Sequence, residues 1–299
     1  MIISIIGTNG LLANEFGLYS NNHNHSIFSF GRKVPEFHKY DEFNILDLEK
    51  ESIDINKISQ SDVIIYTAGA GIQSNLMNSS ESIYHLNVYV PIDICNKLNS
   101  VKYNGVFITF GSCFEIGKNS EDIQFSEIQV CNSILEVPNE YCVSKRLLSR
   151  FVNSYNPSFK HFHFILPTIY GQMEAKHRLI PYLINGIKNN EKMQFTSGKQ
   201  IRQYLYSGDV PEIVFSLLPL IDNGIYNLSG VETFSVRQII ENVFMFYNLQ
   251  INEELFGKAE RVDSGMQNLQ LDGSVVQQKL PNFRYTKFLE SLKLYDKCL

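Results

Sequence analysis

The opening of the chain constrains its fold more than any other stretch, because an apolar run leads through a glycine-containing turn into a segment of helical periodicity. The run covers residues 2–6, and the periodic segment extends to about Tyr19. Glycine lets the backbone turn sharply and approach a ligand, and the N-terminus of a helix favours negative charge. The pattern predicts a diphosphate-binding turn, and the alternative is an ordinary tight strand-to-helix connection. The turn and helix start read Gly7, Thr8, Asn9, Gly10, Leu11, Leu12 and Ala13.

Similar apolar runs recur along the first half of the chain and alternate with helical patterns. Continuous apolar strands that alternate with helices are typical of a parallel sheet covered on both faces. The sequence therefore predicts an α/β fold, a doubly wound parallel sheet of the Rossmann type. The predicted strands are residues 26–30, 43–47, 62–71, 105–110 and 161–166, and the longer helices are 79–98 and 139–155.

The alternation weakens after residue 166, which is typical of a smaller substrate-binding portion attached to a main domain. We therefore predict a cofactor-binding Rossmann domain at 1–166 and a mainly substrate-binding portion at 167–299, some segments of which return to the first domain. In the second portion we expect short strands at 193–195, 204–206 and 225–228, and helices at 209–220, 235–249, 273–279 and 286–297.

Composition argues against several classes of partner. The 299 residues carry a net charge of −5 at pH 7, whereas nucleic acids and anionic membranes select basic patches, so we expect neither as a partner. The first apolar run is too short for a membrane span and lacks a basic leader, which predicts a cytoplasmic protein. The cysteines show no Cys-x-x-Cys spacing, so we expect neither disulfides nor a metal site. They are Cys95, Cys113, Cys131, Cys142 and Cys298.

The end of the second predicted strand bears on the choice of cofactor. Gly31 stands where a carboxylate would bind the hydroxyls of an adenosine ribose, and Arg32 and Lys33 follow it. An acidic residue there would repel a 2′-phosphate, whereas arginine can hold one by bidentate hydrogen bonds. We therefore predict NADP rather than NAD, and the alternative is a solvated basic turn.

Three side chains are candidates for the chemistry. Tyr141 and Lys145 are four residues apart and share one face of a predicted helix, and a nearby ammonium group favours loss of the phenolic proton. Ser112 lies just beyond a predicted strand, at the edge of the sheet where such folds bind ligands. A Tyr-x-x-x-Lys spacing also arises by chance, so the pair gains its weight from the glycine-containing turn and from Ser112.

Other positions support a cofactor site at the same edge. Thr67-Ala68-Gly69 ends a strand in small residues that let a flat cofactor lie close. Pro91 should bend the helix at 79–98 by removing an internal hydrogen bond, and Asn87 could then pair with the freed backbone. The loop at 118–138 has a length that is usually functional in a compact domain.

In this order the motifs resemble the extended short-chain dehydrogenase/reductases of the nucleotide-sugar epimerase/dehydratase type, over essentially the whole chain. The resemblance rests on Gly7, Gly10, Ala13, Ser112, Tyr141 and Lys145, with further matches at Asp47, 67–69, Asn87, 166–171, Arg202 and Asp209. It implies a nucleotide-diphosphate sugar as substrate. The residues expected to bind the NADP cofactor are Gly7, Thr8, Asn9, Gly10, Leu11, Leu12, Arg32, Asp47, Leu48, Thr67, Ala68, Gly69, Asn87, Tyr141, Lys145 and Pro167.

The resemblance also implies roles for the candidate residues. Tyr141 would pass a proton to or from a sugar hydroxyl or ketone, Lys145 would hold the nicotinamide ribose and lower the tyrosine's pKa, and Ser112 would hydrogen-bond the reacting oxygen. Arg202 would contact the diphosphate of the substrate, and Arg178 is a second expected substrate contact. The chemistry agrees, because hydride transfer to a carbonyl creates an alkoxide that needs a proton donor and a polarising hydrogen bond.

Departures from the family pattern narrow the activity. Dehydratases of the family carry an Asp-Glu pair directly after the active-site hydroxyl residue, and here those places hold Cys113 and Phe114. We therefore expect no dehydration, and we interpret Cys113 as a small packed residue. The epimerase/reductases that make GDP-fucose have a histidine where Arg178 stands here. The stretches at 111–117 and 178–181 instead resemble 4-ketoreductases that make deoxy sugars for bacterial surface polysaccharides.

The resulting prediction is NADPH-dependent reduction of a nucleotide-linked 4-keto-6-deoxyhexose. A nucleotide-sugar epimerase, which would recycle tightly held oxidised cofactor, is one alternative. A non-catalytic dinucleotide-sensing module on the same fold is another, although such modules characteristically lack the Tyr/Lys pair. A homodimer is expected through the helices at 79–98 and 139–155. The apolar residues considered for its contact are Val88, Ile92, Leu147 and Phe151, which could equally face the chain's own sheet.

Overall fold

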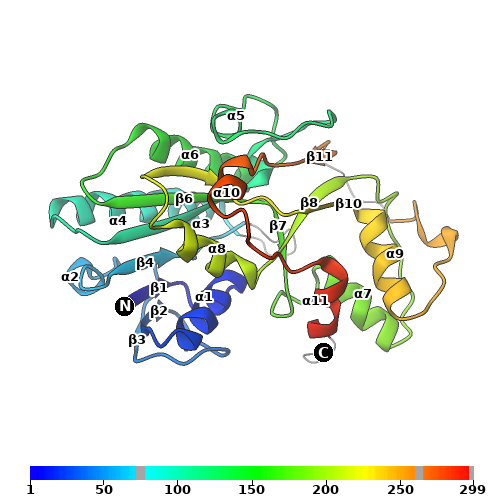
Figure 1. The fold of residues 1–299 in the computed structure, drawn as a ribbon, viewed down its shortest axis with the longest axis horizontal. Helices are drawn as coiled ribbons and strands as arrows, with labels where there is room; N and C mark the ends of the chain where they lie inside the picture. Colours follow the sequence, from blue (N-terminus) through cyan, green and yellow to red (C-terminus); the bar gives the residue numbers. More distant parts are fainter. Residues whose placement is uncertain (72–77, 260–264, 296–299) are drawn as a thin grey trace.

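The structure is a computed structural model that describes residues 1–71, 78–259 and 265–295. Its largest element is a parallel sheet of seven strands in the order β3-β2-β1-β4-β5-β6-β9 (Figure 1). Strands β2 and β3 follow on one side of β1, and the later strands follow on the other side. The sheet is therefore doubly wound, and the predicted fold class is confirmed. The strands are β1 (Ile2–Ile6), β2 (Ser26–Gly31), β3 (Glu42–Ile45), β4 (Val63–Tyr66), β5 (Val106–Ser112), β6 (Lys160–Leu166) and β9 (Gly224–Asn227).

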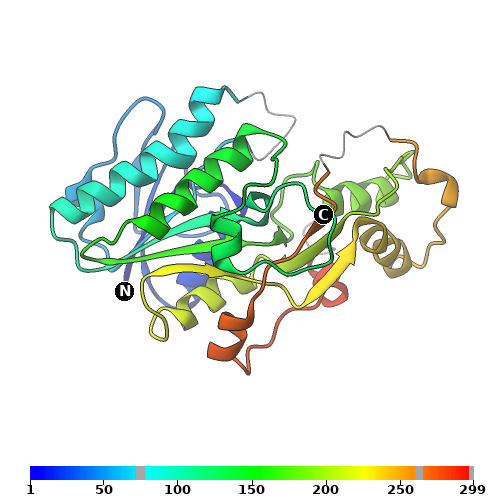
Figure 2. The same cartoon turned by 90° about the horizontal axis from the view of Figure 1, so that it is seen from above.

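Alternating side chains of the sheet build a core on each face. Ile3 and Ile5 of β1 pack with residues of α1 (Leu11–Asn22) and α8 (Asp209–Leu217). Ile6, on the opposite face, packs with residues of α4 (Val90–Ser100), and side chains of α6 (Glu140–Ser154) lie against this second core. Successive side chains of a strand point to opposite faces, so each helix layer covers one set. Figure 2 shows α4 and α6 side by side on one face of the sheet.

A smaller sheet lies beyond β6 in the chain. Its central strand β8 pairs with one antiparallel and two parallel partners. The sheet supports a third apolar core with the helices that follow it. Its strands are β7 (Thr168–Tyr170), β8 (Ile201–Tyr206), β10 (Glu232–Ser235) and β11 (Asn268–Leu269), and the helices beside it are α7 (Leu179–Lys188), α9 (Val236–Phe246) and α11 (Phe288–Tyr295).

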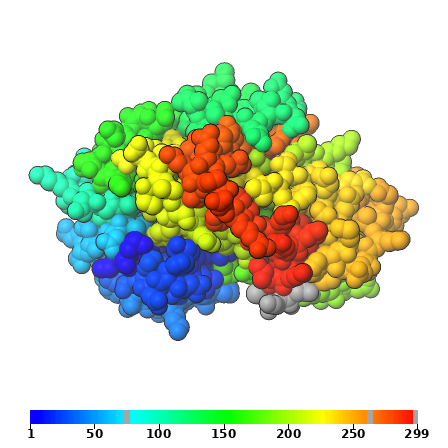
Figure 3. Space-filling model, viewed as in Figure 1, coloured from blue at the N-terminus to red at the C-terminus, as the bar shows by residue number. Residues whose placement is uncertain are grey.

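The C-terminal segment connects the two sheets. Val276 of α10 (Ser274–Lys279) packs into the core of the large sheet, while Phe288 of α11 belongs to the core of the small one. Between them, the Thr286 backbone N–H and hydroxyl donate to the carboxylate of Asp209 at 2.7 and 2.8 Å. Figure 3 shows this orange-to-red segment lying between the blue N-terminal region and the yellow segment around α9. The second half of the chain thus contributes to both cores.

One expectation about helices was confirmed and one was wrong. The segment predicted as a helix at 79–98 is helical throughout, because α3 (Ser80–Tyr84) continues into a π-helical turn (His85–Tyr89) and then into α4, whose second residue is Pro91. The loop predicted at 118–138 contains the short helix α5 (Glu127–Cys131), which begins with a capping box at Ser126.

The strand predicted at 193–195 was also wrong, because these residues form no strand in the structure. Met193 and Phe195 are instead buried in the core of the small sheet, which explains their apolar character. The end of the helix predicted at 286–297 lies outside the described residues, as does Cys298. The remaining short helical elements are α2 (Ile55–Ile58) and the 3-10 turns η2 (Cys113–Glu115) and η3 (Glu253–Leu255).

Four buried cysteines are free, namely Cys95, Cys113, Cys131 and Cys142. A search over the described part of the chain gives no helix long and apolar enough to cross a membrane. The same residues contain no group of three or more His, Cys, Asp or Glu side chains arranged to hold a metal ion.

Candidate active site

The turn after β1 has the geometry that its glycines predict. Gly7 has a φ of +95°, and a Cβ there would lie 2.8 Å from the backbone nitrogen of Ala68, so the position requires glycine. Gly10 begins α1, and a Cβ on it would meet no heavy atom within 4 Å. No side chain of the described residues caps this helix start. The space beside Gly10 is therefore open, and the first N–H groups of α1 have no side-chain cap, so an anionic group can bind there.

The segment after β2 is tied to this turn. The Thr8 hydroxyl donates to the carbonyl of Lys33 at 2.7 Å, and the Asn9 amide donates to the carbonyl of Val34 at 2.9 Å. Thr67, at the end of β4, donates to the carbonyls of Ile6 and Gly7 at 2.9 Å. The predicted cofactor residues of the first, second and fourth strands are thus brought to one edge of the sheet.

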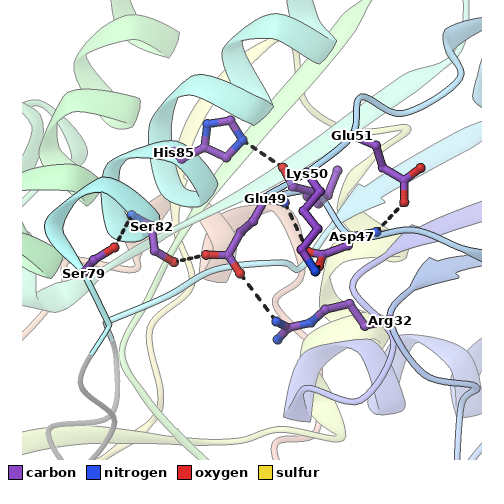
Figure 4. Close-up of polar contacts among 9 residues, drawn as sticks. Arg32, Asp47, Glu49, Lys50, Glu51, Ser79, Ser82 and His85 are labelled. Atoms are coloured by element: carbon purple, nitrogen blue, oxygen red, sulfur yellow. Dashed lines mark hydrogen bonds and ion pairs between the residues drawn. The ribbon is translucent and has the colours of Figure 1, made fainter.

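Figure 4 shows the polar contacts at the far end of this edge. A guanidinium nitrogen of Arg32 lies 3.5 Å from a carboxylate oxygen of Glu49, whose other oxygen accepts a 2.5 Å hydrogen bond from Ser82. Asp47 pairs with Lys50 at 3.1 Å, and this contact is the main cause of a lowered Asp47 pKa. Arg32 therefore lies where the sequence predicted, but its partner, the carboxylate of Glu49, is one that the sequence reasoning missed.

Asn87 has a different role from the one predicted. Its side chain accepts from the Ala70 N–H at 3.0 Å and donates to the Ala70 carbonyl at 2.9 Å and to the Ser144 hydroxyl at 2.9 Å. It therefore joins the segment after β4 to α6 and does not pair with backbone freed by Pro91. A buried amide takes these partners because an unpaired polar group is costly to bury.

Ser112, Tyr141 and Lys145 come together at the end of β5. Tyr141 is 6% exposed, and the nearby Ser112 side chain favours ionisation of its phenol. The ammonium group of Lys145 lies 5.9 Å from the centre of the Tyr141 ring and donates to the carbonyl of Phe110 at 2.9 Å. Ser112 pairs with Leu166 across β5 and β6, which brings Pro167 to the same edge.

The electrostatic expectation for Tyr141 was wrong in this structure. Burial raises the pKa of Tyr141, because a buried phenolate loses its hydration, and the nearby Ser112 side chain only partly opposes this. Burial also lowers the pKa of Lys145, and the carboxylate of Glu115 opposes that shift. Lys145 is bonded to a backbone carbonyl and not to the phenol, so its charge is not a main influence on Tyr141.

The two positions after Ser112 hold no acid–base pair. Cys113 is 2% exposed, and burial raises the pKa of its thiol to about 11. The Phe114 ring meets the Tyr141 ring edge-on, with 6.5 Å between centroids. Cys113 is thus a packed residue, as predicted, and at neutral pH it remains a thiol.

The two arginines expected at the substrate make contacts within the chain. Arg178 pairs with the buried carboxylate of Glu174 at 2.7 Å and donates to the Ile169 carbonyl at 2.9 Å. Burial raises the pKa of Glu174 to about 7, against the attraction of Arg178. Arg202 donates to the carbonyl of Met266 at 2.6 Å, and its charge favours ionisation of the Cys113 thiol. The charge of Arg202 therefore affects the residue that follows Ser112.

Comparison with known proteins agrees with this geometry. The family model described as the NAD dependent epimerase/dehydratase family matches residues 3–229. The chain belongs to this family. It is therefore an enzyme of the NAD-dependent epimerase/dehydratase family, and a nicotinamide dinucleotide is the cofactor class that this membership supports.

Individual relatives are more distant. The chain is 28% identical to a dTDP-D-glucose 4,6-dehydratase of Dictyostelium discoideum and 27% identical to a CDP-abequose synthase of Salmonella muenchen, over 58% and 55% of its own length. These alignments cover 41% and 53% of the two relatives, so the chain matches about half of each. A dTDP-glucose 4,6-dehydratase of Bacillus anthracis in complex with NAD has the same fold, with a TM-score of 0.80 at 14% identity over 99% of this chain and 97% of that one.

Proposed function

We propose that the protein uses NADPH to reduce the 4-keto group of a nucleotide-linked 4-keto-6-deoxyhexose, a step in deoxysugar biosynthesis for a surface polysaccharide. The observation that carries this proposal is the grouping of Ser112, Tyr141 and Lys145 at the end of β5, with no acid–base pair at Cys113 and Phe114. This set can protonate and polarise a carbonyl oxygen, but it offers no carboxylate beside Ser112 for removing water from a hexose.

The residues of the cofactor edge fit a dinucleotide. The open space before α1 suits a diphosphate, and the glycine at position 7 allows the backbone to pass close to it. Arg32 would hold the 2′-phosphate, and Asp47 and Leu48 would border the adenine. Lys145 would hold the nicotinamide ribose, beside the end of β5. The reduced nicotinamide ring supplies the hydride when it is bound.

Within this site the chain's own part in the reaction is proton transfer. The Tyr141 hydroxyl would donate its proton to the carbonyl oxygen of the sugar, and Ser112 would hydrogen-bond the same oxygen as negative charge develops on it. The raised pKa of Tyr141 keeps the phenol protonated at neutral pH, which suits a proton donor in the direction of reduction. Arg202 and Arg178 would bind the diphosphate end of the substrate.

The names of the relatives are compatible with dehydration or with a step that follows it, and the residues after Ser112 favour the later step. One curated relative is named a dehydratase and the other a CDP-abequose synthase. A buried thiol with a pKa of about 11 and a phenyl ring cannot supply the acid and base that dehydration needs. We therefore place the protein after a dehydration step that another enzyme carries out.

One observation favours epimerisation as a second candidate. An epimerase keeps an oxidised cofactor bound and regenerates it in each cycle, and the contact of Glu49 with Arg32 weakens the case for a 2′-phosphate. NAD that co-purifies with the protein and is never consumed would support this alternative. A homodimer through α3, α4 and α6 remains a proposal, for which Leu147 and Tyr89, 42% and 66% exposed, are suitable contact residues.

The test is incubation of the protein with NADPH and a panel of nucleotide-linked 4-keto-6-deoxyhexoses bearing dTDP, CDP or GDP. Loss of nicotinamide absorbance, matched by one equivalent of a reduced sugar nucleotide, is the expected result. Conversion of a nucleotide sugar to its epimer without net loss of NADPH would replace the proposal with the epimerase. Inertness toward every sugar would remove both.

A further inference from the structure

A buried carboxylate lies directly beneath the candidate active site. Glu115, at the end of the η2 turn, is 0% exposed. One of its carboxylate oxygens accepts from the Ser112 N–H at 2.7 Å, and the other accepts from the Ser149 hydroxyl at 2.5 Å. A Cβ on Gly111 would lie 2.6 Å from the first oxygen, so the glycine makes room for the carboxylate. Each oxygen therefore has a defined partner.

Part of this arrangement is an ordinary helix cap. Ser112 and Glu115 form a capping box around the η2 turn, because the Ser112 hydroxyl accepts from the Phe114 N–H while Glu115 returns to the Ser112 N–H. Glutamine serves this position as well as glutamate does. The capping boxes that begin α5 and α9 in fact use Gln129 and Gln238. The cap alone therefore gives no reason for a negative charge at position 115.

The charge has a counterpart in Lys145. Burial lowers the pKa of Lys145, and the Glu115 carboxylate opposes this shift. Burial raises the pKa of Glu115. The hydrogen bonds from Ser149 and from the Ser112 N–H oppose that rise, and the charge of Lys145 opposes it to a smaller extent. A buried charge is tolerated only when it is paired or hydrogen-bonded. Each charge therefore offsets part of the cost that burial imposes on the charge of the other group.

Of the other titratable groups around Glu115, Arg146 also favours the carboxylate, and the rest are uncharged at neutral pH. Arg146 donates to the backbone carbonyl of Glu115 at 2.6 Å, and its charge further favours the carboxylate. The Nε2 atom of His163 and the Ser149 hydroxyl share a hydrogen bond of 2.9 Å. Burial, together with the charge of Lys145, lowers the pKa of His163, so its ring stays neutral. The remaining titratable groups that interact with Glu115 are Tyr141, Cys113, Cys131 and Cys142, which are uncharged at neutral pH.

We propose that Glu115 is a positioning residue of the active site, which orients Ser112 through its backbone N–H and keeps Lys145 cationic as its buried counter-charge. This inference deepens the proposed function, since it rests on Lys145 binding the cofactor ribose and on Ser112 bonding the reacting oxygen. It also explains why the sequence has glycine at 111, because any side chain there would displace the carboxylate.

The test replaces the charge and keeps the cap. Glu115→Gln retains an oxygen that can accept from the Ser112 N–H. For Lys145 acetylation, Glu15→Gln is the matched control, because Glu15 is a buried glutamate of α1 that bonds Ser207. The first measurement is the pH dependence of Lys145 acetylation in the protein without cofactor, read by peptide mass spectrometry. The second is the pH dependence of NADPH binding, read by nicotinamide fluorescence.

In Glu115→Gln we expect the acetylation midpoint and the alkaline loss of NADPH binding to move together to lower pH, by about one unit, the size of shift that a neighbouring opposite charge produces. Glu15→Gln should leave the acetylation midpoint of Lys145 where it is in the wild type. If Glu115→Gln does not fold, Ser149→Ala removes a bond that stabilises the carboxylate and should give a smaller shift in the same direction. Unchanged midpoints in a folded Glu115→Gln or Ser149→Ala protein would overturn the proposal.

Neither measurement uses a sugar substrate, so their failure is distinguishable from failure of the proposed function. A protein that reduces no 4-keto sugar but shows the shift keeps the Glu115–Lys145 pair and loses the assigned reaction. A protein that reduces the sugar with unshifted midpoints keeps the reaction, and Glu115 is then only a helix cap.

Discussion

The contact between Arg32 and Glu49 makes cofactor choice a quantitative prediction. Arg32→Ala should weaken NADPH binding by about tenfold or more and leave NADH binding nearly unchanged. Glu49→Gln should strengthen NADPH binding, because it removes the carboxylate that competes with the 2′-phosphate for the guanidinium. The two variants therefore move NADPH affinity in opposite directions, which a merely structural role for the pair would not do.

The magnitudes follow from the exposure of the pair. The side chains of Arg32 and Glu49 are 69% and 36% exposed, and their closest charged atoms are 3.5 Å apart. An exposed ion pair of this kind contributes about 0–1 kcal/mol, whereas a hydrogen bond to a charged group contributes about 1.5–3 kcal/mol. The phosphate should therefore displace Glu49. Since about 1.4 kcal/mol is tenfold in affinity, losing Arg32 costs about tenfold or more, and losing the Glu49 charge gains up to about fivefold.

The assay is titration of NADPH and NADH into the wild type and both variants at one ionic strength, read by nicotinamide fluorescence. Lys39→Ala makes the same change of net charge at an exposed position elsewhere in the loop between β2 and β3, and it should leave both affinities as they are. Equal losses for NADPH and NADH in Arg32→Ala would refute the reasoning, because the residue would then only support the fold.

Further predictions concern assembly and stability. Leu147→Glu should convert a dimer to monomer in sedimentation at micromolar concentration, because it places a charge on an exposed apolar position of α6; a wild type that is already monomeric would remove the idea. Gly111→Ala should lower the free energy of unfolding in urea by about 1–3 kcal/mol, because the added methyl group meets the Glu115 carboxylate at 2.6 Å. Burial raises the pKa of Glu15 from 4.5 to about 7, so its contribution to stability is full below about pH 4.5 and is lost as the pH rises through 7. Glu15→Gln should remove a stability change of about 1–3 kcal/mol between pH 4.5 and 7, and a pH dependence equal to that of the wild type would contradict the shift.

The fold could be predicted because its determinants are local. Continuous apolar runs such as residues 2–6 and 161–166 form strands in any context that buries both faces, and the turn at Gly7 requires a positive φ that only glycine adopts easily. The end of the sheet where ligands bind follows from the parallel topology alone. Ser112, Tyr141 and Lys145 could therefore be assigned to one place before the structure was known.

The contacts that the sequence did not predict depend on residues far apart in the chain. Glu49 reaches Arg32 only because β3 pairs with β2, and Asn87 reaches Ala70 only because α3 and the π-helical turn lie beside β4. Met193 and Phe195 have the apolar character of a strand, but they pack as irregular chain against the small sheet. Glu115 is part of the stretch 111–117, but the sequence does not show that its side chain is fully buried and bonded to the Ser112 N–H and to Ser149.

The most direct test of the account is single-turnover reduction of a nucleotide-linked 4-keto-6-deoxyhexose by Tyr141→Phe, with NADPH affinity measured on the same preparation. The substitution removes the phenolic proton and keeps the buried ring, so we predict that the rate falls by about 10²–10⁴-fold while NADPH affinity stays within about twofold. Full retention of the rate with intact cofactor binding would contradict the assignment of Tyr141 as the proton donor.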